Sequence, residues 1–167
     1  LSNNQIERVE MFNKDVNATL DLGGKTVSGA IDTLLKVSDG TLSIKNGSLK
    51  NVHTAGNTTA TKYSIYMSGD AVAEITDVNI TTSGVGIWLA ENAKITELNA
   101  NIDSFMNANG YCCFDAVSLV DNARIDQITG GNYVSRITDE YIDGWKATHA
   151  YSGIESWTVN VNGDTAS

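Results

Sequence analysis

The sequence of 167 residues contains no proline and only two cysteines. Proline lacks the backbone N–H that the interior of a sheet ladder requires, so its absence is compatible with a chain built from paired strands. The two cysteines, Cys112 and Cys113, are neighbours. A disulfide framework needs separated pairs, and adjacent cysteines bridge only through a strained ring. This spacing excludes a small disulfide-stapled scaffold and favours reduced, partly buried thiols.

Basic residues are scarce relative to acidic ones, 11 against 20, and the net charge is −9. Such a surface repels the phosphates of nucleic acids and the headgroups of anionic membranes, so we expect neither as a partner. The acidic surface keeps the protein soluble and is also able to hold a divalent cation such as Ca²⁺, but no motif requires a cofactor. The sequence lacks an apolar run of the roughly 18 residues that a membrane-spanning helix needs.

The abundant residues are Asn, Thr, Ser and Gly, while hydrophobic residues make up 41% and charged residues 19% of the chain. Thr suits strands, and Asn and Gly suit the left-handed positions of turns. Helical periodicity is confined to residues 4–13, which we interpret as either a capping helix over one end of the fold or a loose first strand. The composition therefore predicts an all-β protein with many turns.

An Asp or Asn followed by Gly or Ala recurs along the chain and divides it into repeats. Intervals of 31, 22, 30 and 40 residues separate successive pairs. One coil of a three-sided β-helix takes about 20 to 25 residues, so the shortest interval is a bare coil and the others contain insertions. We expect each pair to form a tight corner with left-handed backbone. The pairs are Asp39-Gly40, Asp70-Ala71, Asn92-Ala93, Asn122-Ala123 and Asn162-Gly163.

Apolar residues alternate with period two on both sides of each corner, which is the pattern of a strand with one buried face. Like residues occur at like offsets, so stacked coils would place them in continuous apolar columns. Trp157 and Val159 have the same offsets before the last corner, and we expect them in a fifth coil. The alternative is that the third insertion before them folds aside as a cap. The equivalent residues are Ile65 and Met67, Ile87 and Leu89, Val117 and Leu119 before the corners, with Leu35 and Val37 one place out of step, and Leu42, Ile44, Ala73, Ile75, Ile95 and Ile125 after them.

Residues 18–29 (ATLDLGGKTVSG) and 42–52 (LSIKNGSLKNV) resemble the opening coils of pectate-lyase-like parallel β-helix repeats in secreted and surface proteins of Gram-positive and gut bacteria. The resemblance covers about residues 15–130. It implies a right-handed parallel β-helix, a solenoid of about five coils, at residues 18–167, with residues 1–17 as a cap or first partial coil. It also implies an extracellular or cell-surface location in a bacterium. The chain begins without methionine, and we interpret it as part of a longer protein.

Three insertions share one offset within the repeat, at about residues 51–63, 104–116 and 134–156. They would leave the solenoid at one corner, and loops on a rigid scaffold commonly carry function. They are rich in aromatic, acidic and histidine residues, which are the types that stack on sugar rings and bond their hydroxyls. The alternative is that the rings only pack the loops against the solenoid. The candidate ligand-binding residues in these insertions are Tyr111, Asp115, Tyr141, Asp143, Trp145 and His149.

A second candidate surface is the outward-facing row of residues four places before each corner. Tyr66 and Trp88 occupy this row on adjacent coils, and strands in a sheet lie about 4.8 Å apart. The two rings would form an exposed aromatic ladder, which Ser118 and Thr158 continue. Exposed aromatic surface of this kind is typical of ligand or partner binding, and cover by a loop or an oligomer contact is the alternative.

The sequence predicts a non-catalytic, adhesin-like module that binds polysaccharide or host glycan through the corner loops and the aromatic ladder. One alternative is a passive structural stalk of a larger surface protein. The other is a polysaccharide lyase or glycoside hydrolase with an unfamiliar site. We disfavour it because no recognisable acid–base or metal set is present, and because the D-D, G-H-G and R-x-K motifs of the related hydrolases are missing. The closest candidates for acid–base chemistry are Asp139, Glu140, Asp143 and His149 in the third insertion.

Overall fold

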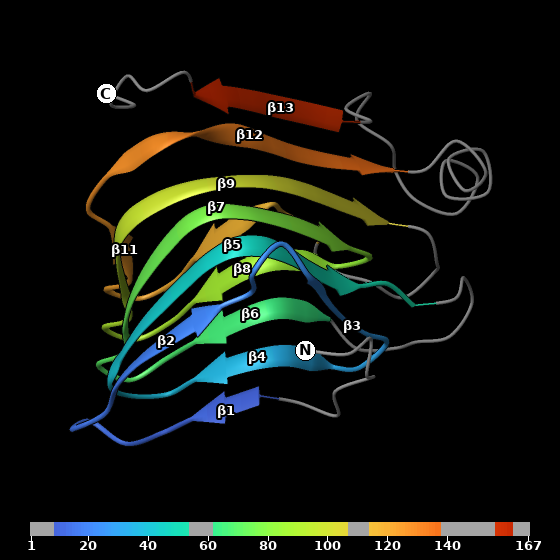
Figure 1. Cartoon of the computed structure of the whole chain (residues 1–167). Helices are drawn as coiled ribbons and strands as arrows, with labels where there is room; N and C mark the ends of the chain where they lie inside the picture. The colour runs from blue at the N-terminus through green and yellow to red at the C-terminus, as the bar shows by residue number, and fades with distance from the viewer. Residues whose placement is uncertain (1–8, 54–61, 107–113, 138–155, 162–167) are drawn as a thin grey trace.

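The computed structural model describes residues 9–53, 62–106, 114–137 and 156–161, the last six and Ile137 as backbone only. Every regular element within these residues is a β-strand, which confirms the all-β class. The strands form two sheets, one of five strands and one of eight (Figure 1). Neighbouring strands run parallel everywhere except in the last pair of the larger sheet.

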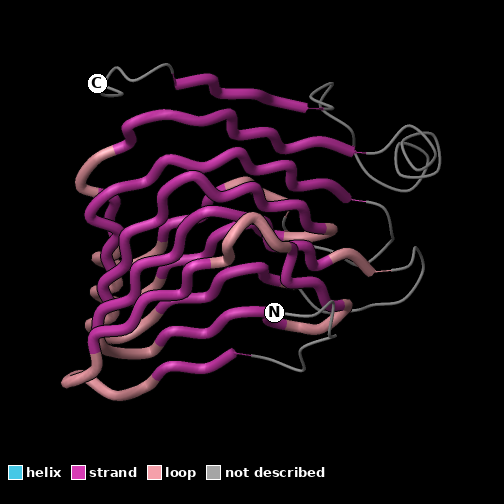
Figure 2. Tube along the Cα trace, in the orientation of Figure 1, coloured by secondary structure: helices cyan, strands magenta, loops and turns pink. Residues whose placement is uncertain are grey.

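The chain passes alternately between the two sheets, and successive passages lie side by side (Figure 2). The five-stranded sheet contains, in order, β1 (Val9–Met11), β4 (Thr33–Val37), β6 (Tyr63–Met67), β8 (Val85–Leu89) and β10 (Val117–Leu119). The eight-stranded sheet contains β2 (Asn17–Asp21), β5 (Thr41–Asn51), β7 (Val72–Thr82), β9 (Lys94–Met106), β12 (Ile128–Ile137) and β13 (Ser156–Val161). Two short strands complete it, β3 (Thr26–Gly29) beside β5 and β11 (Arg124–Ile125) beside β9.

The strand register confirms the repeat that the sequence predicts. The residues stacked at one position of the eight-stranded sheet are Thr41, Val72, Lys94 and Arg124. Their separations of 31, 22 and 30 residues equal the first three intervals between the Asp/Asn pairs. The five-stranded sheet stacks Leu35, Ile65, Ile87 and Val117 at one position, and Val37, Met67, Leu89 and Leu119 two places further on. Like residues lie over like residues because successive repeats keep one register.

The hydrophobic core lies between the two sheets and consists of these stacked apolar residues. Along β7, Ala73, Ile75 and Ile80 are buried, while Glu74 and Asn79 on the opposite face are exposed. Burying one large aliphatic side chain contributes about 1.5 to 3 kcal/mol to folding. The columns therefore sustain a continuous core in a chain of moderate hydrophobicity. The five-stranded sheet supplies Leu35, Ile65, Met67, Ile87 and Leu89 to it.

Three of the corners place the left-handed residue one position earlier than the sequence suggests. The φ angles of Gly69, Glu91 and Asp121 are 62°, 59° and 59°, and each of these residues precedes the Asp or Asn of the expected pair. At the middle corner the N–H of Ala93 donates to the carbonyl oxygen of Ala90 (3.1 Å), which closes a four-residue turn. Ala93 is also fully buried. The small residue of the pair therefore serves packing rather than backbone conformation.

The first corner is one residue shorter than the three that follow it. Here Gly40 itself is left-handed, with a φ angle of 82°, as the Asp39-Gly40 pair predicts. The shorter corner explains why Leu35 and Val37 are out of step in the sequence and yet pair in register with β6.

At the N-terminal end, Val9–Met11 forms the strand β1, which pairs parallel with β4. Of the two interpretations of residues 4–13, the strand is therefore the one observed over this part. Residues 1–8 lie outside the described residues.

At the C-terminal end, the prediction for Trp157 and Val159 was wrong. These residues belong to β13, which pairs antiparallel with β12 and extends the eight-stranded sheet instead of adding a coil to the five-stranded one (Figure 1). Alternation with period two specifies that one face of a strand is buried, but not its partner or its direction. The corner expected at Asn162-Gly163 lies outside the described residues.

Candidate functional site

Three aromatic residues form a cluster on the outer face of the five-stranded sheet. Tyr66 on β6 and Trp88 on β8 are partners in the register, as predicted, and both side chains are partly exposed. Tyr63, at the start of β6, contacts both rings edge-on, with centroid distances of 5.3 Å to Tyr66 and 5.6 Å to Trp88. Edge-to-face contacts of this kind are favourable and hold the rings at fixed angles. The predicted ladder of two rings is therefore an aromatic cluster of three, Tyr63, Tyr66 and Trp88.

A hydrogen bond to Ser118 places Asp115 next to the aromatic cluster. Ser118 is the register partner of Trp88, and its hydroxyl donates to Oδ2 of Asp115 (3.0 Å). The N–H of Gly86 donates to the carbonyl oxygen of Asp115 (2.9 Å), which ties the segment before β10 to β8. The structure thus brings three predicted site residues, Tyr66, Trp88 and Asp115, to one place. Together they offer an apolar stacking surface beside hydrogen-bond acceptors.

The row that contains Tyr66 and Trp88 differs from the prediction at both ends. Lys36 on β4 is the register partner of Tyr66 and gives the aromatic cluster a basic neighbour. The short first corner shifts Lys36 by one place in the sequence, so the common offset does not identify it. Thr158, expected to continue the row, belongs to β13 of the other sheet, and that part of the prediction was wrong.

The remaining predicted site residues are on segments that the structure does not describe. The predictions for these residues therefore lie outside the described part of the chain. They are the ligand-binding candidates Tyr111, Tyr141, Asp143, Trp145 and His149, the acid–base candidates Asp139 and Glu140, and the neighbouring Cys112 and Cys113.

The three insertions begin along one edge of the eight-stranded sheet, as predicted, namely the edge where its long strands end. Four residues stack in register along this edge, and all four are fully buried although they are polar. The insertions follow three of the four strands, β5, β9 and β12, whereas a bare two-residue connection follows β7. This buried polar column consists of Asn51, Thr82, Ser104 and Ser135.

The side chains of the buried polar column form hydrogen bonds with backbone groups where the chain turns. Nδ2 of Asn51 donates to the carbonyl oxygens of Ile31 and Tyr63, both at 2.8 Å, and its Oδ1 accepts the N–H of Ile31 (3.1 Å). The hydroxyl oxygen of Ser135 accepts the N–H of Ala116 (2.9 Å). A buried backbone group without a partner costs about 1 to 3 kcal/mol. The column therefore stabilises the edge from which the insertions leave.

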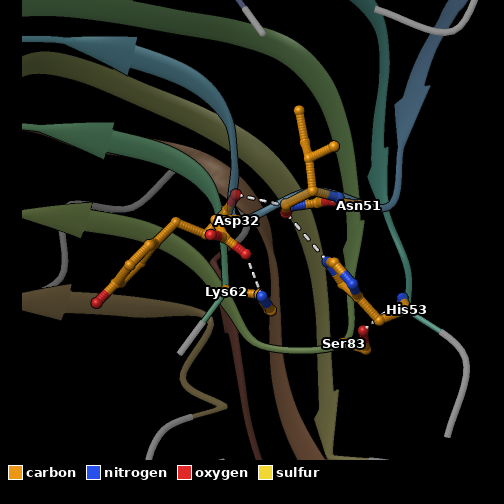
Figure 3. A network of polar contacts seen from close by, with 7 residues as sticks. Asp32, Asn51, His53, Lys62 and Ser83 are labelled. Atoms are coloured by element: carbon orange, nitrogen blue, oxygen red, sulfur yellow. Dashed lines mark hydrogen bonds and ion pairs between the residues drawn. The ribbon is translucent and has the colours of Figure 1, made fainter. Parts of the chain in front are cut away.

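His53 lies in a polar network at the start of the first insertion (Figure 3). Its backbone N–H donates to Oγ of Ser83 (2.8 Å), and its Nε2 donates to the carbonyl oxygen of Ile31 (3.0 Å). The buried amine of Lys62 forms an ion pair with the exposed carboxylate of Asp32 nearby. Burial lowers the pKa of His53, against the bond to Ile31, and the Lys62 charge lowers it further. His53 is thus a buried anchor of the corner.

The described residues contain no group of three or more His, Cys, Asp or Glu side chains that would hold a metal ion. In the same part of the chain, no helix has the length and apolar character needed to cross a bilayer. No known family model matches the chain, and comparisons with curated proteins and with solved structures give no significant match. The class of the protein therefore follows from its fold and site. It is an all-β protein of stacked parallel strands with a partly exposed aromatic cluster.

Proposed function

We propose that the chain is a right-handed parallel β-helix of about five coils that acts as a non-catalytic carbohydrate-binding module on the outside of a bacterial cell. The observation that supports binding is the aromatic cluster with the Asp115 carboxylate beside it. Aromatic rings stack on the apolar faces of pyranoses, and carboxylates accept hydrogen bonds from sugar hydroxyls. The proposed ligand is a polysaccharide or a host glycan.

The position of the aromatic cluster favours ligand binding over a purely structural role. The side chains of Ile65 and Ile87 fill the core on the inner face of the same two strands. Tyr66 and Trp88 lie on the outer face, where they do not contribute to that core, and both retain exposed surface. A sugar stacked on these rings would remove more of this apolar surface from water, at about 25 cal/mol per Å².

Glycan-array screening of the wild-type protein, followed by calorimetry on the glycans retained, tests the proposal. We expect Trp88→Ala to weaken binding by about tenfold or more, which corresponds to about 1.4 kcal/mol of lost stacking. Phe12→Ala is the matched control, because Phe12 is 74% exposed and follows β1, two strands away from Tyr66. We expect the control to bind like the wild type.

Equal loss of binding in Trp88→Ala and Phe12→Ala would mean that any exposed ring holds the glycan, and it would contradict a defined site. If the wild-type protein retains no glycan on the array, the passive stalk becomes the better account. Cleavage of a polysaccharide by the wild-type protein would instead support the enzyme alternative.

A further inference from the structure

A shallow depression of about 150 Å³ lies on the outer face of the eight-stranded sheet. Strands β7, β9 and β12 form its floor, so it belongs to a different sheet from the aromatic cluster. Five of the eight lining residues are polar, although apolar atoms make up most of the exposed lining, and none of the described side chains that line it is aromatic. The polar residues of the lining are Asn79, Thr81, Asn101, Asp103 and Asn132.

Three asparagines cross this depression in register, on strands that lie about 4.8 Å apart. Asn101 on β9 pairs with Asn79 on one side and with Asn132 on the other. Nδ2 of Asn101 donates to Oδ1 of Asn79 (3.0 Å). Within the described residues, Nδ2 of Asn79, Oδ1 of Asn101 and the amide of Asn132 have no further hydrogen-bond partner. The row therefore presents unused donors and acceptors to the solvent.

Asp103 provides a carboxylate of fixed orientation at the same depression. Arg136 on β12 binds it in bidentate fashion, with Nε to Oδ1 at 2.8 Å and a terminal guanidinium nitrogen to Oδ2 at 2.9 Å. The guanidinium lies over the ring of Phe105, with its carbon 5.1 Å from the ring centroid. The side chains of Arg136 and Asp103 remain 39% and 40% exposed. Each carboxylate oxygen can therefore accept another hydrogen bond from a ligand.

We propose that this depression binds an uncharged saccharide through its hydroxyl groups, at a second site that is independent of the aromatic cluster. Of two neighbouring hydroxyls, one donates to the Asp103 carboxylate while the other accepts from an asparagine amide of the row. Arg136 compensates the charge of Asp103, so the site attracts neither anions nor cations strongly. The described lining has no aromatic ring for a sugar face to stack on, so the asparagine and aspartate side chains provide the directional contacts to the hydroxyl groups.

Side-chain amide signals in proton–nitrogen correlation spectra provide a direct test. The wild-type protein is titrated with three uncharged oligosaccharides, cellohexaose, mannohexaose and xylohexaose. We expect at least one of them to shift the Nδ2 signals of Asn79, Asn101 and Asn132. The amide signals of Asn46 and Asn99, on the same face but outside the depression, should not move.

Two variants of β9 form a matched pair for the same titration. Asn101 and Asn99 each donate one side-chain hydrogen bond to β7, to Asn79 at 3.0 Å and to Asp77 at 3.4 Å, but only Asn101 lines the depression. We expect Asn101→Ala to weaken binding about tenfold and Asn99→Ala to leave it unchanged. The shifts should persist in Trp88→Ala, which separates this site from the aromatic cluster.

Three results would overturn the inference. The first is that none of the three oligosaccharides moves the Asn79, Asn101 and Asn132 signals. The second is that the Asn46 and Asn99 signals move to the same extent. The third is equal weakening of binding in both variants, which would show that the loss comes from the stability of the sheet.

Discussion

At the scale of single residues, the left-handed corners show how one repeat holds the next. Glu91 and Asp121 have φ angles of 59° although they carry a β-carbon, which costs about 1 to 2 kcal/mol for each residue. Oε2 of Glu91 accepts the N–H of Gly69 (2.6 Å), and Oδ2 of Asp121 accepts the N–H of Glu91 (3.2 Å). Each side chain thus bonds the same corner position of the preceding repeat. These hydrogen bonds offset the strain of the backbone.

Substitutions at Glu91 separate the strain from the hydrogen bond. Glu91→Ala and Glu91→Gly both remove the carboxylate, but only alanine retains the steric cost of the left-handed conformation. We expect Glu91→Gly to be more stable than Glu91→Ala by about 1 kcal/mol. Urea unfolding followed by circular dichroism measures this difference. Equal stabilities of the two variants would show that the corner is not strained.

The buried imidazole of His53 makes the stability of the fold depend on pH. Burial lowers its pKa in the folded state below the ordinary value of 6.5. The unfolded chain therefore binds the proton more readily, and stability rises with pH in this range. The contribution of His53 is fully present above pH 6.5 and is lost as the pH falls from 6.5 through the folded pKa.

We expect His53→Gln to flatten the stability profile between about pH 7.5 and pH 5, because glutamine does not titrate. Urea unfolding at a series of pH values provides the measurement for both proteins. The substitution leaves all other titratable groups in place, so the difference between the two profiles isolates His53. Parallel profiles would assign the slope to another group.

At the scale of the strands, β12 bends at two adjacent glycines. Its register with β9 shifts between Ile128 and Gly130, and the φ angle of Gly131 is 114°. A β-carbon at position 131 would overlap the backbone carbonyl group of Ala100. At position 130 the nearest atoms all belong to the side chain of Asn99, the closest at 3.0 Å, and a partly exposed side chain can shift more easily than backbone. The bend therefore depends on Gly131 much more than on Gly130.

We expect Gly131→Ala to destabilise the protein by about 3 kcal/mol or more, since the backbone of β9 or β12 must move. Gly130→Ala should cost about 1 kcal/mol or less, because only a surface side chain has to adjust. Urea unfolding of the two variants compares them directly. A Gly130→Ala variant as unstable as Gly131→Ala would contradict this account of the bend.

The repeat could be predicted from the sequence because stacked strands need like residues at equivalent positions. Leu42, Ala73 and Ile95 share an offset from their corners and do pair in register. The direction of β13 could not be predicted, since an alternating strand fits the edge of either sheet and runs either way. Val159 satisfies the pattern equally well in both arrangements.

The candidate site could be predicted only where its residues follow the alternation. Tyr66 and Trp88 share one offset and face outward together. Tyr63 begins its strand at the irregular corner, where the alternation does not show that its ring turns toward them. The buried Asn51 and Ser104 are the first residues of two predicted insertions, so their sequence context is that of solvated loop residues. Their role follows from hydrogen bonds to distant backbone groups, and a single sequence contains no signal for those.

At the scale of the whole molecule, the two sheets end differently. Within the described residues, the last strand of the five-stranded sheet is β10, where Leu119 is 48% exposed. The eight-stranded sheet continues past β12 to the antiparallel strand β13 (Figure 1). An uncovered edge of a long parallel strand is a template for pairing with another chain. β13 therefore protects the longer of the two edges from self-association.

A chain that ends at residue 137 removes β13 and leaves the outer N–H and C=O groups of β12 unpaired. We expect this truncated protein to form oligomers, as measured by size-exclusion chromatography with light scattering. A chain that ends at residue 161 keeps β13 and is the control. A truncated protein with the same molar mass as the control would contradict a protective role for β13.

The bare connection Ser83-Gly84 has a practical consequence for engineering. It joins β7 to β8 at the edge where the neighbouring repeats contain long insertions. The residue before it, Thr82, pairs in register with Asn51 on β5 and with Ser104 on β9. The hydroxyl of Thr82 and the N–H of Ser83 both bond the carbonyl oxygen of Asn51 at 3.1 Å, which anchors the chain just before the connection. A foreign peptide grafted between Ser83 and Gly84 would begin from this anchor. Its point of attachment would lie between the ends of β5 and β9, each about 4.8 Å away because neighbouring strands have this spacing.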